Sequence, residues 1–230
     1  MSKYNKDIED MELDSIADLA EQMIFRLNGC TPTMVRKMLQ IAFADFARVT
    51  CCFTNEYGFE TEKDELYYPV PSTLPKMFVD TICAVWLDGR KLTCPMNYRT
   101  TMISGTPTII FNPRTLSDFC TEDEIVRHPE YADRDYTPQK VRVRIIEIPN
   151  MGSETAPRWF LNKYGEAVVA GALVRLYGMN GKPWADPVQA QSELIRYENF
   201  TTNARINSAS EDGSQCGNGH IETIDTSVLL

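Results

Sequence analysis

Apolar residues recur at helical spacing in two consecutive stretches near the start of the chain. In residues 8–28 they lie three or four positions apart, and Asn28-Gly29 ends the pattern. Thr31 then has the side chain of a helix N-cap, and Pro32 suits the first position of a second helix. The pattern therefore predicts one helix over 8–28 and another from Thr31 to about residue 50.

The pattern changes to short β-branched and aromatic runs between residues 51 and 156. These runs are separated by Gly, Pro and Asp, which is typical of strands joined by turns. Asp88-Gly89 lies between two such runs and can supply the two positive φ angles of a type I′ hairpin turn. Residues 112–138 are charged and have no clear period, so we expect a long surface loop there.

Helical spacing returns at residue 157 and is interrupted once before it continues to residue 206. Small residues at 167 and 170–172 would let another helix approach closely. Between the two helical stretches the sequence predicts a tight helix corner, with a left-handed glycine, an indole packed into the bend and an Asp-Pro start to the next helix. The corner residues are Gly181, Pro183, Trp184, Asp186 and Pro187.

Residues 207–230 lose the helical pattern and begin with a segment rich in Gly, Ser and Asn, which is typical of a flexible linker. Apolar residues then reappear close to the last residue of the sequence. Such residues need a surface to dock on, either in the core of the same chain or on a partner. The candidate docking residues are Ile221, Ile224, Val228, Leu229 and Leu230.

Taken together, these patterns predict an α+β fold class: an antiparallel bundle of about four helices, in two helical hairpins, with a β-rich insertion and an extended C-terminal tail. The expected domain organisation assigns residues 1–50 and 157–206 to the helical bundle. The β-rich insertion takes 51–156, and 207–230 form the tail.

Composition and charge narrow the classes of function. The sequence is 43% hydrophobic, which is enough to build a core, and its net charge of -9 argues against a general nucleic-acid or anionic-membrane binder. It contains no apolar run long enough to cross a bilayer and no export signal, so we expect a soluble protein. Its seven cysteines include no C-x-x-C, which favours free thiols in a reducing compartment.

Candidate catalytic and metal-binding residues are few, and we expect no enzyme activity, cofactor or metal. The two histidines, His128 and His220, lie in the charged loop and the tail, where solvated surface positions are expected. Cys51-Cys52 could hold a reactive thiol, but no histidine base stands in an ordered segment, so packing is the favoured interpretation.

One basic feature has two interpretations. Lys140, Arg142 and Arg144 alternate with apolar residues and so share one side of a predicted strand. They could be the solvated face of an amphipathic strand, with cations protecting a sheet edge. They could also form a basic stripe that faces a polyanion or a partner.

The order of motifs resembles that of the head-to-tail adaptor (connector) proteins of short-tailed bacteriophages, the class that includes tail tubular protein A. The resemblance covers residues 30–206, and it starts with the Pro32 helix that ends in Phe-Ala-Arg. It continues through Leu-Asp-Gly at 87–89 and Gly-Thr-Pro at 105–107. The most specific part is 160–191, with Lys-Tyr-Gly-Glu-Ala and Gly-Lys-Pro-Trp-Ala-Asp-Pro. The loop 112–138, the tail 207–230 and the acidic first helix lie outside it.

The resemblance implies a structural virion protein in the neck of the phage particle. Such a protein forms a ring of about twelve copies, docks on the portal protein and contacts the next tail or nozzle protein. Packaged double-stranded DNA would pass through the ring without sequence-specific contacts. Two other classes stay open from the residues alone: a small DNA-binding regulator that uses 140–144, and a cysteine-dependent enzyme.

Overall fold

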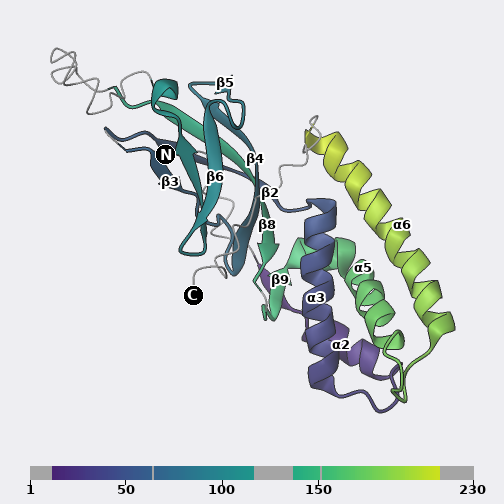
Figure 1. Cartoon of the computed structure of the whole chain (residues 1–230). Helices are drawn as coiled ribbons and strands as arrows, with labels where there is room; N and C mark the ends of the chain where they lie inside the picture. The colour runs from purple at the N-terminus through teal and green to yellow at the C-terminus, as the bar shows by residue number, and fades with distance from the viewer. Residues whose placement is uncertain (1–11, 64, 117–136, 151, 213–230) are drawn as a thin grey trace. The chain divides into compact units, whose positions relative to one another are not determined.

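The computed structural model describes residues 12–63, 65–116, 137–150 and 152–212, with the side chains of 209–212 excepted. These residues form two compact units (Figure 1). The first unit comprises 12–53, 74–78 and the described part of 147–212, and the second comprises the described residues of 54–73 and 79–146. Each unit has its own cluster of buried apolar side chains.

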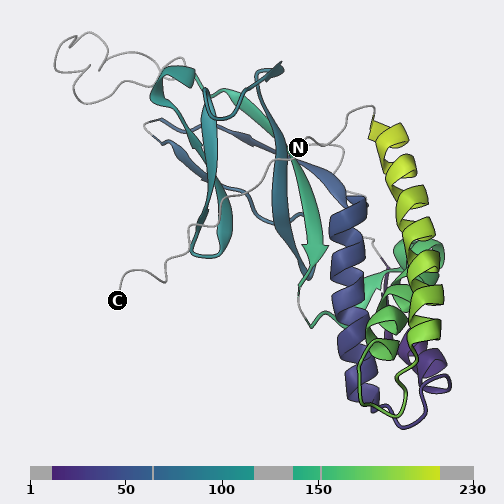
Figure 2. The same ribbon diagram turned by 45° about the vertical axis from the view of Figure 1, so that its right-hand side comes forward.

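Four α-helices lie in the first unit: α2 (Ala17–Ile24), α3 (Pro32–Thr50), α5 (Arg158–Tyr177) and α6 (Pro187–Asp212). The helices α3, α5 and α6 pack on one another, and α2 packs on α3 and α5 (Figures 1 and 2). A two-stranded antiparallel sheet of β1 (Leu13–Ser15) and β9 (Thr155–Pro157) completes this unit.

The start and end of α3 follow from local chemistry. The Thr31 hydroxyl accepts a hydrogen bond from the Met34 backbone N–H at 3.4 Å, and Pro32 occupies the first turn, as predicted. At the other end Cys51 adopts a left-handed conformation with φ 53°, and its N–H bonds the carbonyl of Ala47. This left-handed cap ends the helix and lets the chain change direction.

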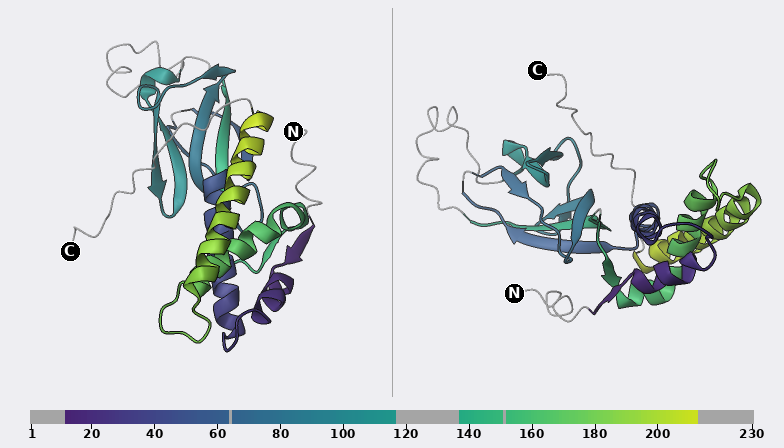
Figure 3. Two further views of the ribbon diagram at one scale, coloured as in Figure 1. Left: turned by 90° about the vertical axis from the view of Figure 1, so that its right-hand side faces the viewer. Right: turned by 90° about the horizontal axis from the view of Figure 1, so that it is seen from below.

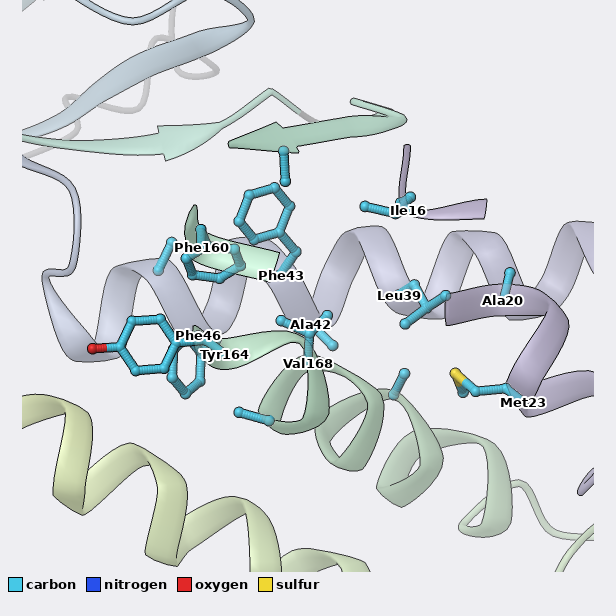
Figure 4. Packing of buried hydrophobic residues seen from close by; sticks show 14 of the residues in the cluster. Ile16, Ala20, Met23, Leu39, Ala42, Phe43, Phe46, Phe160, Tyr164 and Val168 are labelled. Carbon is cyan, nitrogen blue, oxygen red and sulfur yellow. The ribbon is translucent and has the colours of Figure 1, made fainter. Parts of the chain in front are cut away.

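Aromatic side chains from α3 and α5 form the centre of the first core (Figure 4). The ring centroids of Phe43 and Phe160 are 4.7 Å apart, and those of Phe46 and Tyr164 are 5.2 Å apart. Phe53, just after α3, adds a further ring at 5.1 Å from Phe160. Aromatic pairs at these separations add to the stability that burial provides.

The strands β2 (Thr54–Glu60), β8 (Lys140–Pro149), β4 (Met77–Leu87) and β5 (Arg90–Lys91) form a four-stranded sheet in that spatial order. A three-stranded sheet has the order β3 (Tyr67–Pro69), β7 (Thr106–Phe111), β6 (Tyr98–Ile103). A short 3₁₀ turn, Pro113–Thr115, follows β7. Side chains from both sheets contribute to the second core, of which Val143, Ile109 and Phe111 are members.

The hairpin prediction at Asp88-Gly89 is confirmed. These two residues join β4 to β5 with φ angles of 48° and 82°, and Leu87 pairs with Arg90. Both central residues of a type I′ turn need positive φ, which Asp tolerates and Gly adopts freely. A second turn of this kind, at Ser104-Gly105, joins β6 to β7, although the sequence did not predict strand β6.

The predicted fold class, a helical bundle with a β-rich insertion, is wrong. The described residues hold nine strands in three sheets beside the four helices, so the structure is β-rich rather than a bundle interrupted once. Strands also occur outside 51–156, because residues 13–15 pair with 155–157 instead of continuing a helix. The expected helix over 8–28 is therefore reduced to α2, which has eight residues, and the first long helical hairpin does not form.

Candidate interaction surfaces

The corner between α5 and α6 has the local chemistry that its sequence predicts. Asp186 caps α6 with one carboxylate oxygen, which accepts the N–H groups of Val188 and Gln189 at 3.0 Å each. Pro187 is the first helical residue, and Gly181 supplies a left-handed bend with φ 75°. The bend is closed by a hydrogen bond from the Asp186 N–H to the Tyr177 carbonyl at 3.0 Å.

Trp184 packs back into this corner, as expected, but it is half-buried rather than enclosed. Its indole N–H is shielded from water and has no hydrogen-bond partner among the described residues. Pro183 lies over the turn between α2 and α3, since a Cβ placed on Gly29 would be 3.9 Å from the Pro183 Cβ. The corner therefore joins the α2–α3 turn to the α5–α6 turn.

Helix α5 is enclosed by its neighbours where its residues are smallest. A Cβ on Gly171 would lie 2.8 Å from the ring of Tyr197 on α6 and 3.4 Å from the Cβ of Ala42 on α3. The absence of a side chain at Gly171 thus sets the separation of three helices. This confirms the prediction that the small residues of α5 permit close approach.

Charged side chains fix the same helices to one another. Arg175 on α5 forms an ion pair with Asp45 on α3 and also donates to the Gly171 carbonyl at 2.7 Å. Glu193 on α6 is buried and accepts from Arg26, after α2, at 2.7 Å. Ion pairs between separate elements specify one helix arrangement, because a buried carboxylate without its cation would be costly.

The basic stripe lies on β8, where the structure reproduces the predicted alternation. Lys140 and Arg142 are exposed and Arg144 is half-buried, while the apolar residues between them are buried. The stripe does not protect a sheet edge, because β8 lies between β2 and β4.

Both arginines of the stripe have partners from neighbouring strands. The carboxylate of Glu56 on β2 is 3.6 Å from a guanidinium nitrogen of Arg142 and 3.2 Å from one of Arg144. The guanidinium groups also lie over the Trp86 ring on β4, at 4.6 Å and 5.4 Å from its centroid. The stripe is therefore a stacked and partly neutralised cluster on the sheet face.

A groove along the solvent side of α3 was not predicted. It has a volume of about 500 Å³ and lies between α3 and the turn before β9. A smaller hollow of about 120 Å³ lies beside it, next to β1, and shares three of its residues. The groove is lined by Thr33, Arg36, Lys37, Gln40, Ile41, Ala44, Gly152 and Glu154.

The groove combines two cations with an apolar floor. Arg36 and Lys37 are exposed, and neither forms an ion pair with another described residue. Ile41 and Ala44 are half-exposed between the helix and the turn. The groove could hardly be predicted from sequence, because Ile41 and Ala44 are only two apolar positions on the polar side of α3. Its opposite wall comes from residues 152–154, which are far from α3 in the sequence.

Three of the described cysteines lack the low thiol pKa of a catalytic nucleophile. None of the five described cysteines, Cys30, Cys51, Cys52, Cys83 and Cys94, forms a disulfide with another described residue. Burial raises the pKa of the Cys52 thiol to about 12, and burial also raises the pKa of Cys30 and of Cys94. A raised pKa removes the thiolate form that attacks electrophiles at neutral pH.

Several candidate residues of the sequence lie outside the described residues. These are the docking residues Ile221, Ile224, Val228, Leu229 and Leu230, and the histidines His128 and His220. Within the residues that are described, no group of three or more His, Cys, Asp or Glu side chains is arranged to hold a metal ion. No helix in that part of the chain has the length and apolar character needed to cross a membrane.

Comparison with known proteins identifies no relative: no family model matches the chain, and no curated protein matches it.

Proposed function

We propose that the chain is a structural virion protein, a head-to-tail adaptor that docks on a phage portal as a ring of about twelve copies. In that position it connects the capsid to the next tail protein and surrounds the path of the DNA. The observation that carries the proposal is the ordered motif set over 30–206, whose most specific part is 160–191. In the structure those residues make α5, the capped corner and the start of α6.

Two features of the molecule support a mechanical role. Ion pairs and close contacts join α3, α5 and α6, so the helices can transmit force as one body. The net charge of -9 also suits a passage for DNA, because a strongly basic lumen would retain the phosphates that must pass through it.

The two alternative functions have less support. A DNA-binding regulator would need free cations on β8, but Arg142 and Arg144 contact Glu56 and stack on Trp86. A cysteine-dependent enzyme would need a thiol with a lowered pKa, whereas burial raises the pKa of Cys30, Cys52 and Cys94.

The test is a measurement of mass in solution with and without the portal protein of the phage that encodes the chain. We expect a mass near 26.2 kDa for the chain alone and a ring of about twelve copies on the portal. Failure of the full chain to bind any face of the portal would contradict the adaptor proposal.

A truncation separates the docking residues from the folded part. Removal of 213–230 leaves α6 complete to Asp212, whereas a cut at 207 would remove its last turns. We expect the truncated chain to keep its helical circular dichroism and to lose portal binding. Unchanged binding would exclude the tail as the docking segment.

A further inference from the structure

The outward face of α6 has an unusual composition for a solvated helix surface. Val188, Ile195 and Ile206 expose 77%, 52% and 61% of their surface. They are seven and eleven residues apart, which is close to two and three helical turns, so all three lie on one face. The opposite face packs on the core through Ala204 and the buried Glu193.

The other residues of this helix face are uncharged. On this face the helix carries Gln191, Ser192, Asn199, Thr202 and Asn203, all exposed. Solvated helix faces are typically charged, whereas the centres of protein interfaces are depleted in charge. In a chain with 24% charged residues, an uncharged face with three exposed aliphatic side chains points to a buried contact in an assembly.

The groove along α3 is the complementary surface on the same unit. The groove has Ile41 and Ala44 in its lining, and α6 contributes no residue to it. Arg36 and Lys37 line the groove, and neither forms an ion pair with a described residue. Glu154 supplies the one carboxylate among the lining residues. Glu198 borders the α6 face, is exposed and forms no ion pair with a described residue. The groove thus carries two cations, and the α6 face is bordered by an anion, none of which is ion-paired with a described residue.

We infer that the outward face of α6 packs head to tail into the α3 groove of a second copy of this chain. The inference rests on the proposed function and deepens it, because a ring closes only when two different faces of each subunit meet. Glu198 of one copy then lies near Arg36 and Lys37 of the next.

The size of the face predicts that the subunits assemble only on a template. From Val188 to Ile206 the face is about 27 Å long, and with a width of about 10 Å it buries at most roughly 270 Å² per copy. A stable interface buries about 800 Å² per partner. One such contact is therefore weak in solution, and it becomes persistent when the portal holds neighbouring copies side by side.

The contact can be mapped by photo-crosslinking in the full chain. A benzophenone amino acid replaces Gln191, on the outward face, and in the control it replaces Gln189, which lies to the side of that face. Mixing ¹⁵N-labelled and unlabelled copies identifies crosslinks between molecules. We expect mixed-isotope crosslinks from position 191 to residues 33–44, at several times the yield from position 189.

Charge reversal supplies an independent readout. Glu198→Lys should lower the yield of these crosslinks about fivefold, and adding Arg36→Glu and Lys37→Glu to the same chain should restore it. These side chains are exposed, so the variants should keep the wild-type melting temperature. Failure of the triple variant to restore crosslinking would overturn the assigned pairing.

The remaining outcomes are also decisive. Crosslinks from position 191 to α6 of a second copy would show that the two copies meet in a two-fold contact and not head to tail. A crosslinking yield from position 191 no higher than that from position 189 would show that this face of α6 forms no interface between copies. If the wild-type chain still forms a ring on the portal in either case, the adaptor function stands and only this inference fails. If crosslinks form as expected but the chain never binds a portal, the self-contact stands and the adaptor function fails.

Discussion

At the scale of single residues, close packing of α3, α5 and α6 depends on the missing side chain of Gly171. The ring of Tyr197 that faces it also lies 6.1 Å from Phe46, measured between ring centroids. Burial raises the pKa of the Tyr197 phenol, which is consistent with a ring held against the core. This ring has little freedom to move aside.

Replacing Gly171 by Ala should therefore destabilise the protein, although the same change usually stabilises a helix. The added methyl group would lie 2.8 Å from the Tyr197 ring, and we expect a loss of about 1–3 kcal/mol in the free energy of unfolding by urea. Gly165→Ala is the matched control in the same helix, because its methyl group would meet Leu19 at 3.6 Å, an ordinary contact distance. A stabilising effect at both positions would contradict the packing described for Gly171.

Cys52 gives a prediction for the dependence of stability on pH. The pKa of its thiol is about 12 in the folded chain, against 9.0 for a cysteine exposed to water, because burial disfavours the thiolate. As the pH rises through this window the unfolded chain loses a proton that the folded chain keeps, so the free energy of unfolding falls. We expect a Cys52→Ala variant to show a shallower fall between about pH 9 and pH 12 in urea titrations. Parallel curves for the two proteins would show that Cys52 is not the group responsible.

The role of a residue could be predicted from sequence where the groups that it contacts are near it in the chain. Thr31 and Asp186 accept hydrogen bonds from backbone N–H groups within three residues, so their capping roles could be predicted, as could Pro187 as a first helical residue. The packing of Trp184 into the corner was predicted, but its degree of exposure was not, because that depends on other elements. The partners of Arg142 could not be predicted either, since Glu56 and Trp86 come from other strands.

At the scale of elements, α6 depends on a cap that the sequence specifies. Asp186 satisfies two of the N–H groups that a helix leaves free at its first turn. We expect Asp186→Ala to lower the free energy of unfolding by about 1 kcal/mol and Asp186→Asn to retain most of it, as measured by thermal unfolding. Equal losses in both variants would indicate that charge rather than hydrogen bonding is the main contribution.

The periodicity of apolar residues was not sufficient to predict where each helix and strand begins and ends. The apolar spacing of residues 16–27 predicted a helix, and Ile16, Ala20, Met23 and Leu27 are buried, although only Ala17–Ile24 is helical. It could not reveal that 13–15 form a strand, because that strand is defined by pairing with 155–157. The groove along α3 was missed for the same reason, since Gly152 and Glu154 form its other wall.

At the scale of the whole molecule, charge decides which partners are compatible with the chain. With a net charge of -9 and the β8 arginines paired to Glu56, the isolated chain should not bind duplex DNA even at low salt. The measurement is fluorescence anisotropy of a labelled duplex across a salt series. A binding curve that weakens steeply with salt would support the regulator alternative instead.

The two strands of the small sheet, β1 and β9, are synthesised at different times (Figure 3). Its two strands are separated by about 140 residues, and ribosomes add about 5–20 residues per second. Residues 13–15 thus leave the ribosome on the order of ten seconds before the strand with which they pair. During translation residues 13–15 have no pairing partner until residues 155–157 are made. Chaperones, or slow codons near position 155, should therefore change the yield of native protein more than its stability.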